Sequence, residues 1–150
     1  MKIKHLFVGF GLLAMAACTG SKTLGTTNPA PSYYATNPND AFEVTEYSKD
    51  KNYGYTEKDP ILVGKPEGMG GPKEEQMFLN ALKGPLGQDL GYRRLGSCCS
   101  FKSDNGYMGG GLLDKYEIIW DGQDEPVILY INMYDHGDMF IPEGFTAAND

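Results

Sequence analysis

Apolar residues recur at every second position in one stretch of the second half of the chain. Tyr116, Ile118 and Trp120 are separated by single residues, which is the period of a half-buried strand. Residues 127–133 are almost wholly apolar, as expected for a central strand that is covered on both faces. The two patterns predict neighbouring strands of one sheet.

Three shorter segments extend this prediction. Residues 92–95 and 97–102 are expected to be strands separated by Gly96, where a glycine favours a bulge or a bend. Residues 61–63 form a short apolar run before Gly64 and predict one more strand.

A single helix is expected between these strands. Pro72 suits its first position, and Glu74 and Glu75 fall in its first turn, where the helix dipole favours anions. Gly84-Pro85 is expected to end it after Lys83. Its apolar face is formed by Phe78, Ala81 and Leu82. The sequence therefore predicts an α+β fold: a small antiparallel sheet with one packed helix.

The segment before residue 59 is polar and lacks a clear period. We expect residues 18–58 to be a flexible tether and residues 59–150 to be the compact domain. Within the tether, residues 42–55 are ambiguous, because Phe42, Val44 and Tyr47 allow either an edge strand or disorder.

The first 17 residues are typical of a bacterial lipoprotein signal peptide. A basic start with Lys2 and Lys4 precedes an apolar run over residues 6–14, which is too short to span a bilayer. Ala16-Ala17 directly before Cys18 resembles a lipobox, in which signal peptidase II cuts before a diacylated cysteine. An ordinary cleaved secretion signal and a chance cysteine are the alternatives.

Charge excludes one class of partner. The chain has a formal net charge of −7, and cleavage before Cys18 removes Lys2 and Lys4, leaving −9. Nucleic-acid binding needs clustered Lys and Arg, so no nucleic-acid partner is expected. The lipid at Cys18 would provide the membrane attachment. Residues 19–23 contain neither an aspartate nor an acidic run, which favours the periplasmic face of the outer membrane.

Cys98-Cys99 is the most unusual feature of the compact domain. In a regular strand the two side chains point to opposite faces, so the favoured interpretation is two structural strand residues, with Cys99 buried. The alternatives are a strained vicinal disulfide with a redox role, a metal ligand pair and an intermolecular bridge. An exported protein meets an oxidising compartment, which keeps the disulfide open as a possibility.

Two further groups have weaker chemical signals. Asp135, His136 and Asp138 follow the apolar strand and could coordinate a cation, although a solvated turn is the simpler interpretation. Arg93-Arg94 could pair with carboxylates, bind an anion or protect a strand edge. Neither group implies a cofactor, and none is expected.

Five stretches resemble a group of small lipoproteins from Bacteroidota. They are GPKEEQMFLNALKGPLGQ (71–88), RRLGSCCSF (93–101), GLLDKYEI (111–118), LYINMYD (129–135) and IPEGF (141–145). Members often carry the label 2-dehydro-3-deoxyphosphooctonate aldolase. That aldolase is a TIM barrel of roughly 250 residues, which a compact domain of about 90 residues cannot build. The group supplies no catalytic residues to transfer.

Two functional hypotheses follow. The first is a non-catalytic envelope lipoprotein, a binding or accessory subunit that docks on a partner protein. The second is a small thiol-dependent or lyase-like enzyme that uses Cys98 and Cys99. The enzyme requires a cysteine thiolate beside a base in a cleft, whereas the binding protein requires exposed aromatic side chains in one patch.

The anchor gives a first prediction. We expect the mature N-terminal peptide to begin at Cys18 and to carry acyl chains, so that the protein partitions into detergent. Mass spectrometry of that peptide and phase partitioning measure this, with Cys18→Ala as the control that stays in the aqueous phase. A free N-terminus beyond Cys18 on a water-soluble protein would contradict it.

Overall fold

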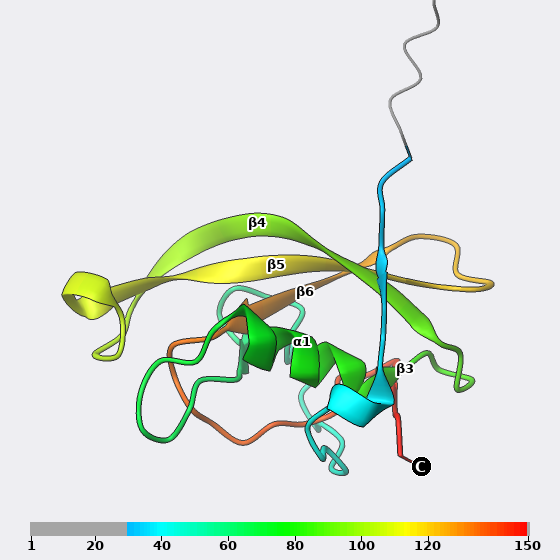
Figure 1. Cartoon of the computed structure of the whole chain (residues 1–150), viewed down its shortest axis with the longest axis horizontal. Coiled ribbons are helices and arrows are strands. Elements are labelled where there is room, and N and C mark those ends of the chain that lie inside the picture. The colour runs from blue at the N-terminus through cyan, green and yellow to red at the C-terminus, as the bar shows by residue number, and fades with distance from the viewer. Residues whose placement is uncertain (1–29, 150) are drawn as a thin grey trace, which may run out of the picture. The chain divides into compact units, whose positions relative to one another are not determined.

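The computed structural model describes residues 30–149, and its main element is a five-stranded sheet. Three antiparallel strands form its centre: β4 (Leu90–Lys102), β5 (Gly110–Trp120) and β6 (Val127–Asn132). Figure 1 shows these three long strands. The short β1 (Tyr34–Ala35) pairs antiparallel with β4, and β2 (Ile61–Leu62) pairs with β6 in parallel, which gives the strand order β1-β4-β5-β6-β2. The predicted α+β fold is confirmed. The sheet is mixed rather than wholly antiparallel, because β2 reaches β6 in the parallel sense.

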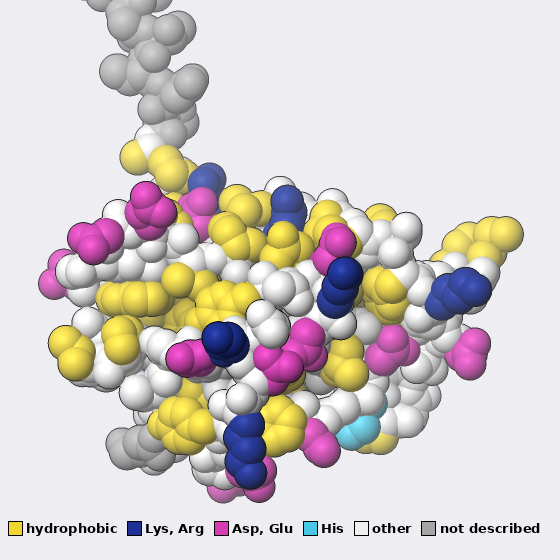
Figure 2. Space-filling model, turned by 180° about the vertical axis from the view of Figure 1, so that it is seen from behind, with side chains coloured by type: hydrophobic (Ala, Val, Ile, Leu, Met, Phe, Trp, Pro, Cys, Tyr) yellow, Lys and Arg dark blue, Asp and Glu magenta, His cyan; other side chains and the backbone are white. Residues whose placement is uncertain are grey.

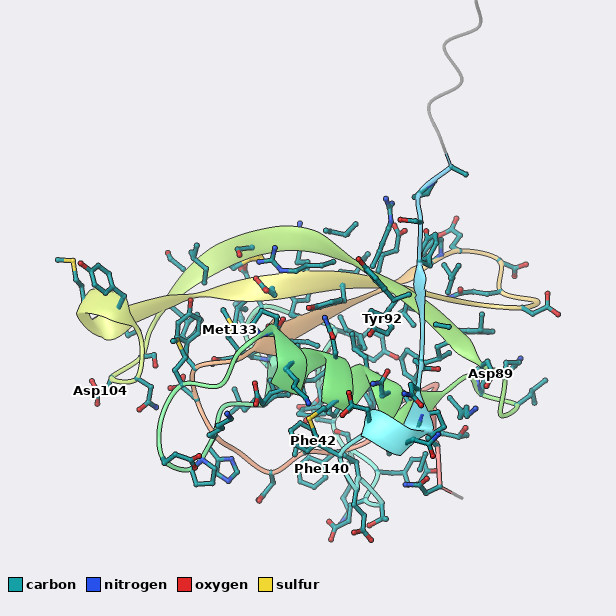
Figure 3. The ribbon with its side chains drawn as sticks, viewed as in Figure 1. Phe42, Asp89, Tyr92, Asp104, Met133 and Phe140 are labelled. Atoms are coloured by element: carbon teal, nitrogen blue, oxygen red, sulfur yellow. A yellow bond between two sulfur atoms is a disulfide. The ribbon has the colours of Figure 1, made fainter. Side chains whose placement is uncertain are left out.

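Helix α1 (Pro72–Asn80) packs against one face of this sheet. Glu74 closes its first turn by accepting a 2.8 Å hydrogen bond from the backbone N–H of Gly71. Phe78 and Leu79 are fully buried against the strands. Tyr92 points from β4 toward the helix (Figure 3), so the core lies between the two layers.

The helix ends three residues earlier than the glycine and proline signals predict. Leu82–Lys83 forms β3, which pairs antiparallel with β7 (Thr146–Ala147). The Ala148 N–H also donates to the Ala81 carbonyl at 2.8 Å. Pairing with the C-terminal segment therefore replaces the last helical turn, a long-range contact that local sequence does not encode.

Residues 31–58 belong to the compact domain, so the predicted boundary at residue 59 is wrong. Val44 and Tyr53 are buried in the core, at 5% and 7% exposure. The Phe42 N–H donates to the Met77 carbonyl of α1, and the Ser48 N–H donates to the Ile141 carbonyl. Two 3₁₀ turns, Pro38–Asp40 and Tyr107–Gly109, complete the described secondary structure.

The core combines residues from both halves of the chain. Its buried members are Val44, Tyr53, Ile61, Val63, Phe78, Leu79, Ala81, Leu82, Leu90, Tyr92, Tyr116, Ile118, Leu129, Ile131, Ile141, Phe145 and Ala147. The alternation predicted for residues 116–120 is confirmed, because Tyr116 and Ile118 are buried whereas Glu117 and Ile119 are partly exposed. No helix among residues 30–149 is long and apolar enough to cross a membrane.

β4 is one long strand interrupted by two register shifts. The first lies between Arg94 and Gly96, and the second between Cys98 and Ser100. Gly96 has φ +125°, a left-handed conformation that glycine adopts without the cost of a side chain. The bulge predicted from this glycine is therefore confirmed, with Leu95 as its extra residue.

The placement of residues 31–58 generates a second prediction. Val44→Ala removes buried methyl groups and should lower the free energy of unfolding by about 2 kcal/mol. Thr45→Ala, at the exposed neighbouring position, should change it by less than about 0.5 kcal/mol. Chemical denaturation of both variants measures the difference. Equal, small losses would place this segment outside the core.

Candidate functional site

Cys98 and Cys99 are joined by a disulfide between neighbouring residues. The favoured sequence interpretation, two unpaired strand residues, is therefore wrong. The two sulfurs can meet because of the second bulge in β4. Cys98 pairs with Leu113 and Ser100 pairs with Leu112, which leaves Cys99 as the extra residue. Strand alternation fails there, so both sulfurs are able to meet.

The backbone of Cys99 is left-handed, with φ +50°. This region costs a non-glycine residue about 1–2 kcal/mol. Cys99 is thus held in an unfavourable conformation at the point where the disulfide closes. Both cysteines are partly exposed.

The outer edge of β4 is open beside this disulfide. Among the described strands, only β1 pairs with that edge, and it covers only Gly91 and Tyr92. Among residues 30–149, no strand pairs with residues 94–102 on that edge, and the two bulges bend them away from a flat template. This region combines the disulfide, the bulges and a free strand edge.

A polar network lies beside the bulges, between β4, β5 and α1. Arg94 binds the carboxylate of Asp114 with two hydrogen bonds, from Nε at 2.5 Å and from Nη2 at 2.7 Å. Ser97 Oγ donates to the same carboxylate at 2.7 Å. Asp114 is 1% exposed, so its charge is paired in a buried position.

Glu75 enters this network from the helix. It is fully buried, and the Tyr116 hydroxyl donates to its Oε2 at 2.7 Å. Its Oε1 has no donor facing it among the described residues, and the neighbouring acceptor is the Asp114 carboxylate. A proton on Glu75 that is donated to Asp114 satisfies both oxygens.

The pKa shifts of Glu75 and Asp114 agree with a proton on Glu75. Burial raises the pKa of Glu75 to about 8, although the Tyr116 hydrogen bond opposes the shift. Burial also acts to raise the pKa of Asp114, but hydrogen bonds from Arg94 and Ser97 outweigh it and lower the value. At neutral pH the pair therefore carries one negative charge, which Arg94 balances.

Sequence reasoning placed Glu75 correctly in the first turn of the helix but missed that it is buried in a polar network. The signal was its position three residues before Phe78, which places it on the apolar face of the helix. For Arg93 and Arg94, pairing with carboxylates was one of the predicted roles. Arg93 donates from Nε to Glu117 at 2.8 Å, so both predicted arginines pair with carboxylates of β5.

The predicted metal candidates do not converge. Both oxygens of Asp135 already accept hydrogen bonds, from Ser103 and Asn105 on one oxygen and from Asn132 on the other. Burial acts to raise the pKa of Asp135, but these bonds outweigh it and lower the value. Asp135 organises a turn.

His136 and Asp138 face other surroundings. His136 Nδ1 lies 3.0 Å from the Gly64 carbonyl, which accepts its hydrogen. It lines a mainly apolar cavity of about 190 Å³, whereas Asp138 lines a different one of about 330 Å³. Residues 30–149 contain no group of three acidic, His or Cys residues able to hold a metal ion.

The tip of the β4–β5 hairpin projects from the body and is apolar (Figure 2). Tyr107 and Met108 on the connecting turn are 88% and 90% exposed. Leu112, opposite Ser100 near the start of β5, is 45% exposed. We call Tyr107, Met108 and Leu112 the hairpin patch. Asp104 at the same end and Asp89 at the opposite end show the length of the hairpin (Figure 3).

Cys18, the predicted lipidation site, lies outside the described residues. Comparisons give no relative to guide the assignment, since no family model, curated protein or solved structure matches the chain.

The buried carboxyl pair yields a third prediction. Glu75 keeps its proton to about pH 8 in the folded state and loses it near pH 4.5 when unfolded. The folded protein then binds more protons between these values, so stability should fall as pH rises from about 4.5 to about 8. The slope is at most about 1.4 kcal/mol per pH unit. Glu75→Gln should remove this pH dependence, and at pH 8 the variant should be more stable than the wild type.

Glu74→Gln is the matched control, because the Glu74 pKa shifts the other way. Burial acts to raise that pKa, but hydrogen bonds from Lys65 and from the backbone outweigh it and lower the value. This variant should therefore keep the Glu75-dependent decline. Thermal melts across the pH range measure both. A wild-type melting temperature that stays level from pH 5 to pH 8 would rule out a buried proton.

Proposed function

We propose that this chain is a lipid-anchored protein of the cell envelope that acts as a non-catalytic binding or accessory subunit. Cys18 would carry the lipid, and the periplasmic face of the outer membrane is the proposed location. The hairpin patch would be the contact surface for a partner protein. The observation that carries this proposal is the exposure of Tyr107 and Met108 at the end of a long hairpin.

Position supports a contact at this tip. β1, through which the chain enters the domain, pairs with Gly91 and Tyr92 near the start of β4. The strand then continues to Lys102, a distance of roughly 30 Å for extended chain. The hairpin patch therefore lies far along the sheet from β1.

Composition favours a protein partner over a membrane at this tip. Tyrosine and methionine are enriched in protein interfaces, where they supply apolar area and adapt to a partner's surface. The acidic chain, at −9 after signal cleavage, would be repelled by anionic lipid. An envelope protein with an apolar pocket for Tyr107 and Met108 is the proposed occupant.

The enzymatic hypothesis finds less support in the geometry. It needs a thiolate beside a base, whereas both Cys98 and Cys99 sulfurs are used in their disulfide. The described cavities are lined by residues 42–59, 63–66, 74–77 and 136–140, away from the two cysteines. The aldolase label remains incompatible with a single small α+β domain.

Site-specific photo-crosslinking tests the proposed contact, our fourth prediction. A benzoylphenylalanine in place of Tyr107, in cells that make the lipoprotein, should form one discrete adduct with an envelope protein. Tyr34 is the matched control, because it is 68% exposed on β1 at the other end of the sheet. The same probe at Tyr34 should not form that adduct.

A second substitution separates a specific contact from a chance encounter. Met108→Ser removes apolar area without touching the core and should weaken the Tyr107 adduct several-fold. An adduct with lipid alone would assign the tip to the membrane. Identical adducts from Tyr107 and Tyr34, or none from either, would refute the hairpin patch as a partner surface.

A further inference from the structure

We propose that Cys98–Cys99 is a thiol–disulfide exchange site, whose reduction by a thiol donor releases the bulge at the outer edge of β4. This inference does not depend on the proposed binding function. It stands on three observations: a disulfide between neighbours, the left-handed backbone of Cys99, and the register shift at that residue.

Access is the first requirement for exchange. Both cysteines are partly exposed, and they lie on the stretch of β4 that no described strand covers. The bridge is therefore placed where an attacking sulfur can reach it.

The exchange reaction balances without any other oxidant. A donor thiolate attacks one sulfur, the bond between the Cys98 and Cys99 sulfurs breaks, and the leaving sulfur takes up a proton. A second donor thiol then attacks the mixed disulfide and frees the other cysteine. Two thiols appear on the protein and one disulfide appears on the donor, so two electrons and two protons have moved.

Reduction has a structural consequence at Cys99. A left-handed φ is unfavourable for a non-glycine residue and persists only where the surroundings hold it. The disulfide is one such restraint, because it fixes both cysteine side chains on adjacent backbone positions. Once the bridge opens, Cys99 can return to an extended conformation. The bulge, which blunts the open edge, then loses its restraint.

The nearby interactions confine this change to one end of the hairpin. The Arg94–Asp114 pair and Ser97 hold the strand on the side toward the core. On the other side, the Phe101 ring packs edge-on against Tyr134, with the ring centroids 5.8 Å apart. We therefore expect reduction to loosen residues 98–100, between these two restraints, and to leave β6 unchanged.

Redox titration of the full-length lipoprotein in detergent tests the exchange. Dithiothreitol or glutathione is added without denaturant, and free thiols are trapped with a maleimide and located by mass spectrometry. We expect Cys98 and Cys99 to become labelled together and reversibly. If only dithiothreitol opens the bridge, the donor is a dithiol. If glutathione opens it as well, the donor is any thiol. A bridge that neither reagent opens in the folded protein overturns the proposal.

Amide hydrogen exchange tests the structural consequence on the same samples. Reduction should speed amide exchange in residues 98–100 on the order of tenfold, while residues 127–132 keep their rates. Unchanged rates at residues 98–100 in a reduced sample would show that the disulfide does not hold the bulge, and would overturn that part of the proposal.

Two double variants separate the bridge from the backbone shape. Cys98→Ser with Cys99→Ser removes the bridge and should exchange like the reduced protein. Cys98→Ser with Cys99→Gly also removes the bridge, but glycine accepts a positive φ, so its exchange should stay close to that of the oxidised protein. If both variants exchange alike, the backbone of Cys99 does not control the edge and the proposal fails.

Discussion

The pairing of β4 with β5 is the interaction on which the other features depend. It runs from Leu90 opposite Trp120 to Lys102 opposite Gly110. The ladder provides the face that covers the helix, the network that binds Glu75 and the hairpin that carries Tyr107 and Met108. Two extra residues in β4, Leu95 and Cys99, shift this ladder without ending it.

As a consequence, the two halves of β4 differ in their surroundings. Its beginning is covered by β1 and fixed to the core through Tyr92. Its far half is open, bulged and cross-linked, which protects an exposed edge against unspecific pairing. The buried pair of Glu75 and Asp114 lies between these halves and joins the helix to the sheet.

Much of the fold could be predicted because local signals agreed with the tertiary structure. Pro72 and the two following glutamates placed the start of the helix, and the alternation around Ile118 placed a strand. Val44 and Tyr53 could not be placed, since each is an isolated apolar residue whose burial depends on partners far along the chain. The cysteine pair was misassigned because regular alternation was assumed where a bulge breaks it. For Asp135 and His136, the residue types were suggestive, but the hydrogen bonds that occupy them come from distant loops.

The central claim is that β4 stays paired with β5 across a bulge at Cys99. Nuclear Overhauser contacts across the strands of the labelled full-length protein test it most directly. The account predicts contacts of Cys98 with Leu113 and of Ser100 with Leu112, with no cross-strand partner for Cys99. A contact between Cys99 and Leu112 instead would show an unbulged ladder and contradict it.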